Sequence, residues 1–204
     1  MSYEARKFGV SRSTRENEAK SKCPDLQIVY VPEQRGKADL TCYRQAGAEV
    51  IQILSEFTDI IERASIDEAF LDVTELVAKR IEMCGLENSI ITPESVPNTQ
   101  VTGFKGESSG ESCLAGWLRK EGSKSELSLA AGAMVANDIR REVFERTGLT
   151  CSAGIGQNKV DCTQTYSAYN YSTCTLLQFF LFKDPYGTFN MHTVHILCYQ
   201  LLIV

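Results

Sequence analysis

The segment 62–72, which reads ERASIDEAFLD, constrains this chain most, because it places two adjacent carboxylates inside an otherwise strand-like stretch. Successive side chains of a straight strand point to opposite faces of a sheet. Asp67 and Glu68 can therefore serve one site only if the chain bends there, and Ile66-Asp67 can supply the bend. The segment predicts a β-hairpin with both carboxylates near its tip.

Paired carboxylates suggest a metal site. Hard divalent cations such as Mg²⁺ take oxygen ligands, few from the protein and the rest from phosphates and water. A site with two metal ions needs carboxylates that bridge the ions, and two carboxylates alone are too few. The alternative is a solvated Asp-Glu pair at a charged turn, which is a common arrangement. The spacing by itself leaves both readings open.

Four segments, in order along the chain, resemble the Y-family translesion DNA polymerases. The sequence Ser65-Ile66-Asp67-Glu68, with its flanking residues, is similar to the catalytic palm motif of that family. The other three segments are similar to the start of the fingers, to the crossing from fingers to palm, and to the next palm strand and turn: residues 3–13, 35–44 and 151–160. The resemblance covers residues 2–160.

The resemblance implies an α/β fold, namely an incomplete polymerase palm, whose mixed sheet is backed by helices 39–58 and 127–147, with a small fingers subdomain. It divides the chain into a fingers-like segment (1–38), a partial palm (39–160) and an unmatched apolar tail (161–204). The implied activity is DNA-directed DNA synthesis by two Mg²⁺ ions, inserting deoxynucleotides opposite damaged bases in the nucleus. The implied partners are a damaged DNA template-primer and a deoxynucleoside triphosphate.

The same resemblance assigns roles to individual residues. Asp67 would bridge both metal ions, and Glu68 would hold the ion that activates the primer 3′ hydroxyl. Tyr3 and Arg6 would bind the β and γ phosphates of the nucleotide, where an arginine donates charge-assisted hydrogen bonds. Arg12 would lie over the incoming base and triphosphate, since a planar guanidinium can stack as well as pair. The alternatives are an exposed aromatic and cation on an ordinary helix, and a loop arginine.

Two lysines are further candidates. Lys37 and Lys159 stand in segments that carry the resemblance, so either is a candidate for contact with DNA or phosphate. Solvated lysines are equally consistent with the sequence.

Family members open with a palm strand that carries the first metal-binding aspartate, and they continue into a thumb and a DNA-gripping domain. The sequence has no counterpart of these parts. We therefore expect the isolated chain to be inactive, as a truncated isoform that binds nucleotide weakly or as a product that does not fold. The remaining strands are expected to keep unpaired edges, with which the apolar tail segment 176–182 could pair.

Composition limits the other function classes. The net charge of −5 and the pI near 5.2 argue against strong binding of nucleic acid by overall charge, so a local patch must bind any DNA. Eight cysteines without a C-x-x-C pair, and no signal sequence, indicate an intracellular chain with reduced thiols. No apolar stretch reaches the length of a membrane helix, so no membrane partner is expected.

Local patterns predict the remaining elements. Ser13 and Glu16 fit a capping box, so a helix is expected over 14–22. Apolar spacings of three and four predict a helix from residue 39 onward and another over 127–146, with Gly148 as its C-cap. Other expectations are a helical turn at 3–8, a strand at 26–31, helical periodicity over 74–81, an exposed insertion at 85–112 and a strand at 149–155.

Overall fold

The computed structural model describes residues 3–84, 92, 95–96, 99–102, 124–159, 162, 175–178 and 195–202. The helices are α1 (Tyr3–Lys7), α2 (Glu16–Lys22), α3 (Thr41–Ser55), α4 (Thr74–Cys84) and α6 (Lys124–Thr147). The strands are β1 (Glu33–Gln34), β2 (Lys37–Ala38), β3 (Ile61–Arg63), β4 (Glu68–Asp72), β5 (Thr99–Thr102), β6 (Thr150–Gly156), β7 (Thr175–Gln178) and β8 (His195–Leu202).

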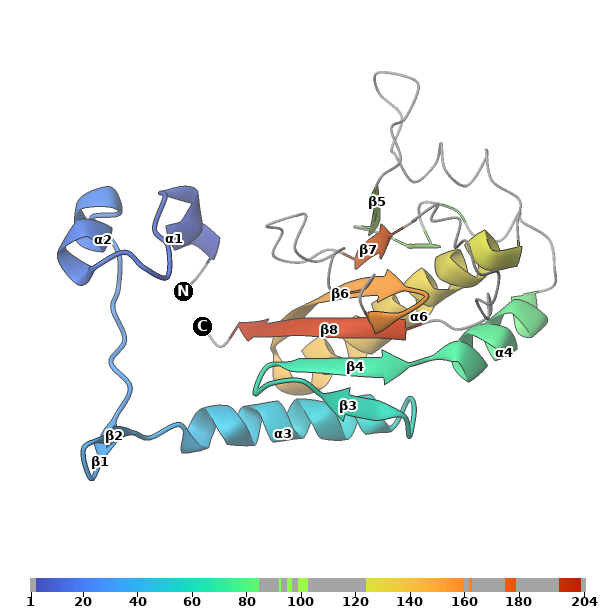
Figure 1. Cartoon of the computed structure of the whole chain (residues 1–204), viewed down its shortest axis with the longest axis horizontal. Helices are drawn as coiled ribbons and strands as arrows, with labels where there is room; N and C mark the ends of the chain where they lie inside the picture. Colours follow the sequence, from blue (N-terminus) through green and yellow to red (C-terminus); the bar gives the residue numbers. More distant parts are fainter. Residues whose placement is uncertain are drawn as a thin grey trace, which may run out of the picture.

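Within the described residues, six strands form one mixed sheet in the order β3-β4-β8-β6-β7-β5 (Figure 1). The neighbours β3, β4, β8 and β6 are antiparallel, whereas β7 is parallel to both β6 and β5. A mixed sheet backed by helices is what the resemblance implied. The expected α/β class is therefore confirmed.

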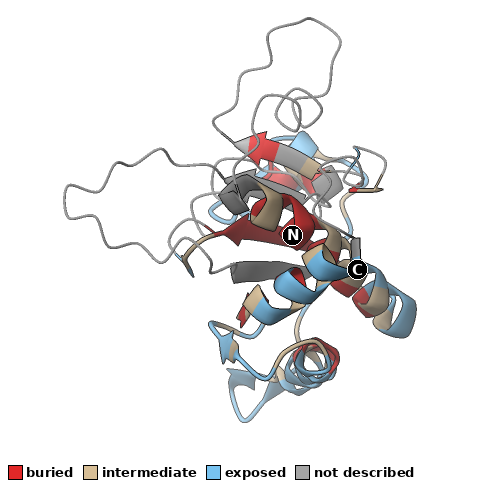
Figure 2. Ribbon diagram, turned by 90° about the vertical axis from the view of Figure 1, so that its right-hand side faces the viewer, coloured by how far each residue is buried: buried red, intermediate tan, exposed pale blue. Residues whose placement is uncertain are grey.

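The main hydrophobic core lies between the sheet and the helices α3 and α6. Figure 2 shows the buried residues concentrated where helices meet the sheet. Helix α3 contributes Val50, Ile53 and Leu54, whose spacing of three and one puts them on one face. Helix α6 contributes small residues such as Ala133 and Ala136, which let its backbone approach the sheet closely. Among the described residues, no helix combines the length and the apolar character needed to span a membrane.

The boundaries of α4 and α6 follow from local chemistry. The Asp72 carboxylate accepts hydrogen bonds from the backbone N–H of Thr74 (2.9 Å) and from the Thr74 hydroxyl (2.6 Å), which starts α4 directly after β4. Helix α6 ends before Gly148, whose φ of +70° is the left-handed conformation of a C-cap. The β3–β4 hairpin and α4 therefore follow one another directly along the chain.

Two expectations for the first forty residues are wrong. The capping box at Ser13 does not form: α2 begins at Glu16 with Arg15 as its N-cap, and the Ser13 hydroxyl contacts the Ser11 hydroxyl instead. Residues 26–31 are not a strand, because none of the strands that the structure describes pairs with them, and Val29 and Tyr30 are 80% and 72% exposed. A β-propensity without a partner strand does not make a sheet.

The insertion at 85–112 was expected to be an exposed loop, and within the part that the structure describes this is wrong. Val96 and Val101 are buried in the main core, and β5 pairs with β7 of the tail. The other residues of 85–112 lie outside the described residues. Two tail segments, β7 and β8, join the sheet, and β7 overlaps the segment 176–182 that was expected to pair with an edge.

Candidate functional site

The segment 64–67, called here the hairpin tip, joins β3 to β4. The two strands pair antiparallel, with Arg63 opposite Ala69. The backbone N–H groups of Ala64 and Ser65 both donate to the carbonyl of Glu68, at 2.9 and 3.2 Å. The bend predicted from adjacent carboxylates is therefore present at the predicted place.

Arg63 holds the hairpin tip in position. Its Nε donates to the carbonyl of Ser65 at 2.9 Å, and its Nη2 donates to the carbonyl of Ile66 at 3.2 Å. Two hydrogen bonds from one planar guanidinium restrict the path of the backbone just before Asp67. The side chain that orients the tip was not identified from the sequence as a functional candidate.

The Ser65 side chain fixes the Asp67 carboxylate at the bend. The Ser65 hydroxyl donates to Oδ1 of Asp67 at 2.8 Å, and the Asp67 backbone N–H lies 3.3 Å from the same Ser65 oxygen. Asp67 and Glu68 both line the pocket between α3 and the hairpin tip, so they border a common space.

This arrangement perturbs Glu68. Burial raises the pKa of the Glu68 carboxyl above its ordinary value, and the negative charge of Asp67 raises it further. The hydrogen bond from Ser65 and the positive charge of Arg12 lower the pKa and offset part of this rise. The pair of carboxylates is thus an electrostatically unfavourable arrangement that a cation would stabilise.

The burial of Glu68 has a structural cause. A pocket between α3 and the hairpin tip is lined by Asp67, Glu68 and Cys151, and its other lining residues are apolar or glycine, with Val50 and Leu54 among them. An apolar surrounding disfavours the ionised form of a carboxyl.

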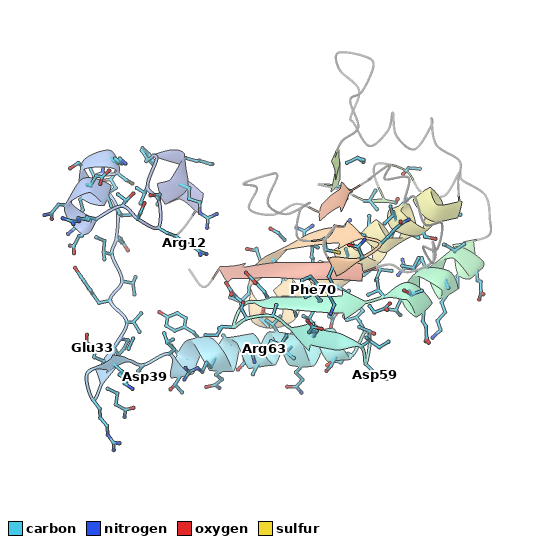
Figure 3. All side chains as sticks on the ribbon, viewed as in Figure 1. Arg12, Glu33, Asp39, Asp59, Arg63 and Phe70 are labelled. Carbon is cyan, nitrogen blue, oxygen red and sulfur yellow. The ribbon has the colours of Figure 1, made fainter. Side chains whose placement is uncertain are left out.

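Arg12 is a predicted nucleotide-binding residue whose positive charge lowers the pKa of Glu68. It lies in the segment between α1 and α2, on the side of these helices that faces the end of the sheet (Figure 3). Its charge acts on Glu68 across a separation of more than fifty positions in the sequence. Arg6 is half-buried on α1, and the side chain of Tyr3 lies outside the described residues, so their predicted roles stay predictions.

The two candidate lysines are in different surroundings. Lys37 is exposed on β2, which pairs with β1 in a separate two-stranded sheet. Lys159 forms an ion pair with Glu62 of β3, and its ammonium lies 5.5 Å from the centroid of the Phe70 ring. Glu62 was not a sequence candidate, because its partner is 97 positions away and no local pattern joins them.

The donor set at the hairpin tip fits a hard divalent cation. Asp67 and Glu68 line one pocket and offer carboxylate oxygens, and the repulsion between their charges favours a bound positive charge. Within the described ranges, no group of three or more His, Cys, Asp or Glu side chains is placed to hold a metal ion. The remaining ligands of an ion here would be water and substrate phosphates, as is usual for Mg²⁺.

Comparison with known proteins agrees with this arrangement. The profile of the impB/mucB/samB family matches residues 1–163. The chain is 39% identical to DNA polymerase eta of Arabidopsis thaliana, over 78% of this chain and 24% of that protein. It is 35% identical to DNA polymerase eta of Drosophila melanogaster (78% and 20%) and 30% identical to human DNA polymerase iota (78% and 18%).

The chain spans about a quarter or less of the length of these relatives. The family match ends at residue 163, so it contains α3, the hairpin tip and β6 but neither β7 nor β8. The family profile matches most of the chain, and the matched residues include the hairpin that carries Asp67 and Glu68. The chain therefore belongs to the impB/mucB/samB family of Y-family DNA polymerases.

Proposed function

We propose that this chain provides the fingers and part of the palm of a translesion DNA polymerase, with Asp67 and Glu68 holding divalent ions for nucleotidyl transfer. The observation that carries the proposal is the bend at the hairpin tip, where Asp67 and Glu68 line one pocket and the Ser65 hydroxyl hydrogen-bonds the Asp67 carboxylate. The similarity to proteins named DNA polymerase eta supports the same reading. Mg²⁺ is the proposed ion, and the nucleus is the proposed location.

The reaction joins the primer 3′ oxygen to the α phosphorus of a deoxynucleoside triphosphate and releases pyrophosphate. Divalent ions, when bound, would neutralise the negative charge of the reacting phosphates. Glu68 must lose its proton to bind an ion, and the nearby charge of Arg12 favours that ionised form. Arg12, Arg6 and Tyr3 are the proposed contacts for the base and the phosphates of the nucleotide.

We propose DNA contacts for Lys37 and Lys159, whose surroundings differ. Lys37 is exposed and offers a charge that is accessible to phosphate. Lys159 already pairs with Glu62, so a phosphate oxygen would have to compete with that carboxylate. A chain with a net charge of −5 requires such local cations to approach a nucleic acid.

Binding of Mn²⁺, followed by electron paramagnetic resonance with and without a deoxynucleoside triphosphate, tests the metal role. We expect Asp67→Asn and Glu68→Gln each to weaken Mn²⁺ binding by about tenfold or more, the scale on which altering a metal site lowers affinity. Asp59→Asn is the matched control, because Asp59 is a carboxylate at the opposite end of β3 (Figure 3). Equal affinity of wild type and Asp67→Asn would refute the proposed site.

A second candidate function is binding of metal and nucleotide without DNA synthesis. The observation that favours it is that β8, which lies beyond the family match, places Tyr199 and not a third carboxylate opposite Glu68 in register. Primer extension by the whole chain with Mg²⁺ separates the two functions. Extension that disappears in Asp67→Asn supports the polymerase, whereas Mn²⁺ binding without extension supports the second candidate.

A further inference from the structure

Gly47 occupies an unfavourable place for a glycine. It lies in the interior of α3, where glycine is the least favoured residue after proline. It is buried, although it carries no side chain to contribute to the core. A glycine that costs helix stability at a buried position usually has a packing reason.

The packing reason is the hairpin tip. A Cβ atom at position 47 would lie 2.5 Å from the carbonyl oxygen of Ile66 and 3.1 Å from Nη2 of Arg63. The first distance is shorter than any real Cβ contact, and the contacted atom is backbone, which cannot rotate away as a flexible side chain can. A side chain at this position would therefore have to displace the hairpin tip or the helix.

The contacts around this carbonyl lead to the carboxylates. Arg63 donates to the same Ile66 oxygen at 3.2 Å, so the oxygen is held between the guanidinium and the helix. The next residue along the chain is Asp67, and both Asp67 and Glu68 line the pocket that Gly47 also lines. The distance between Ile66 and α3 therefore sets the position of the backbone from which the Asp67 and Glu68 side chains extend.

We propose that Gly47 is a positioning residue, whose missing side chain lets the hairpin tip seat against α3 so that Asp67 and Glu68 face one cation. The inference rests on the proposed metal role of these carboxylates. Gly47 acts only through the path of the backbone, since it offers no ligand atom of its own to an ion.

The test compares Gly47→Ala with Gly154→Ala in the whole chain. Gly154 is the matched control, because a Cβ there would also meet backbone, the carbonyl of Cys162 at 2.6 Å, but on β6 rather than at the hairpin tip. Mn²⁺ affinity is measured by electron paramagnetic resonance, and the titration of the Glu68 carboxyl is followed by NMR without metal.

In Gly47→Ala we expect Mn²⁺ binding to weaken by about tenfold or more, as for other changes in residues that orient metal ligands. We also expect the pKa of Glu68 to fall toward its ordinary value, because the carboxyl moves away from Asp67 and from the apolar pocket. Gly154→Ala should leave both quantities as in the wild type. Unchanged Mn²⁺ affinity and unchanged Glu68 titration in a folded Gly47→Ala chain would overturn the inference.

The two proposals fail in different ways. If the wild type binds no Mn²⁺, the metal role fails, and the backbone amide NMR shifts of residues 65–68 in Gly47→Ala then decide whether Gly47 positions the hairpin tip. If Gly47→Ala does not fold, Arg63→Gln replaces it, since this change removes the guanidinium that holds the Ile66 carbonyl without adding volume beside α3. A wild-type Glu68 titration in Arg63→Gln would then count against positioning through the tip.

Discussion

At the scale of single residues, Glu68 has a carboxyl whose pKa is raised by its surroundings. Its carboxyl is partly removed from water by the apolar pocket and lies beside the charge of Asp67, and both effects raise its pKa. A raised pKa means that the folded chain binds a proton that the unfolded chain has already lost. Glu68 therefore favours the fold at low pH, and this contribution is lost as the pH rises through the folded-state pKa.

Because ionised Glu68 is unfavourable in the folded chain, we predict that Glu68→Gln stabilises the metal-free chain at pH 7 by about 0.5 kcal/mol. Contributions of this size are expected for partly exposed charges, which solvent screens. Near pH 3 the difference between variant and wild type should largely vanish, because Glu68 is then mostly protonated in both the folded and the unfolded chain. Urea unfolding at the two pH values measures it. Mn²⁺ should raise the midpoint of the wild type but not of the variant, and a variant less stable than the wild type at pH 7 would contradict the prediction.

At the scale of elements, β8 holds the sheet together. It lies between β4 and β6 and pairs antiparallel with both, whereas those two strands do not pair with each other (Figure 1). Leu197 is opposite Phe70 on one side and Gly154 on the other. A strand from outside the family match thus connects the carboxylate hairpin to β6.

We predict that Leu197→Pro lowers the free energy of unfolding by at least about 1–3 kcal/mol, because proline removes a ladder donor and leaves a partner group unsatisfied inside the sheet. Hydrogen exchange of the amides around Ala69 and Leu71 should accelerate with it. Leu202→Pro, at the last pair of β8, is the control and should have a much smaller effect. Equal, wild-type protection of β4 in both variants would show that β8 does not support the sheet.

At the scale of the whole molecule, the described residues form two hydrophobic clusters of very different size. The larger one unites α3, α4, α6 and the sheet. The smaller one consists of Ala5, Val10 and Ala19, with Cys23 and Leu26 packed against it. Its helices span 5 and 7 residues, shorter than an isolated helix needs for stability.

We therefore predict that α1 and α2 open independently of the main core. The amide of Ala19, which donates to the Arg15 carbonyl in α2, should exchange at least about 100-fold faster than that of Leu71, which is fully buried. Native-state hydrogen exchange read by NMR measures both amides in one experiment. Similar protection of the two would mean that the small cluster folds together with the core.

Local sequence was enough for the elements whose cause is local. Apolar spacing predicted α3 and α6, Gly148 predicted the end of α6, and adjacent carboxylates predicted the bend before β4. The capping box predicted at Ser13 does not form, although it is a local pattern. The hydroxyls of Ser13 and Thr14 hydrogen-bond the Ser11 hydroxyl instead. A single sequence motif does not specify which of several nearby hydrogen-bond partners a side chain will take.

The sequence by itself determined the helical faces, the carboxylate bend and the family, since each depends on residue types at short fixed spacings. Only the tertiary structure decided that residues 26–31 lack a partner strand, that Val101 is buried beside β7, and that β8 lies between β4 and β6. It also decided the contacts of Gly47 with Ile66 and of Lys159 with Glu62. These depend on which distant segments meet, because pairing and close packing join residues whose separation along the chain leaves no periodic signal.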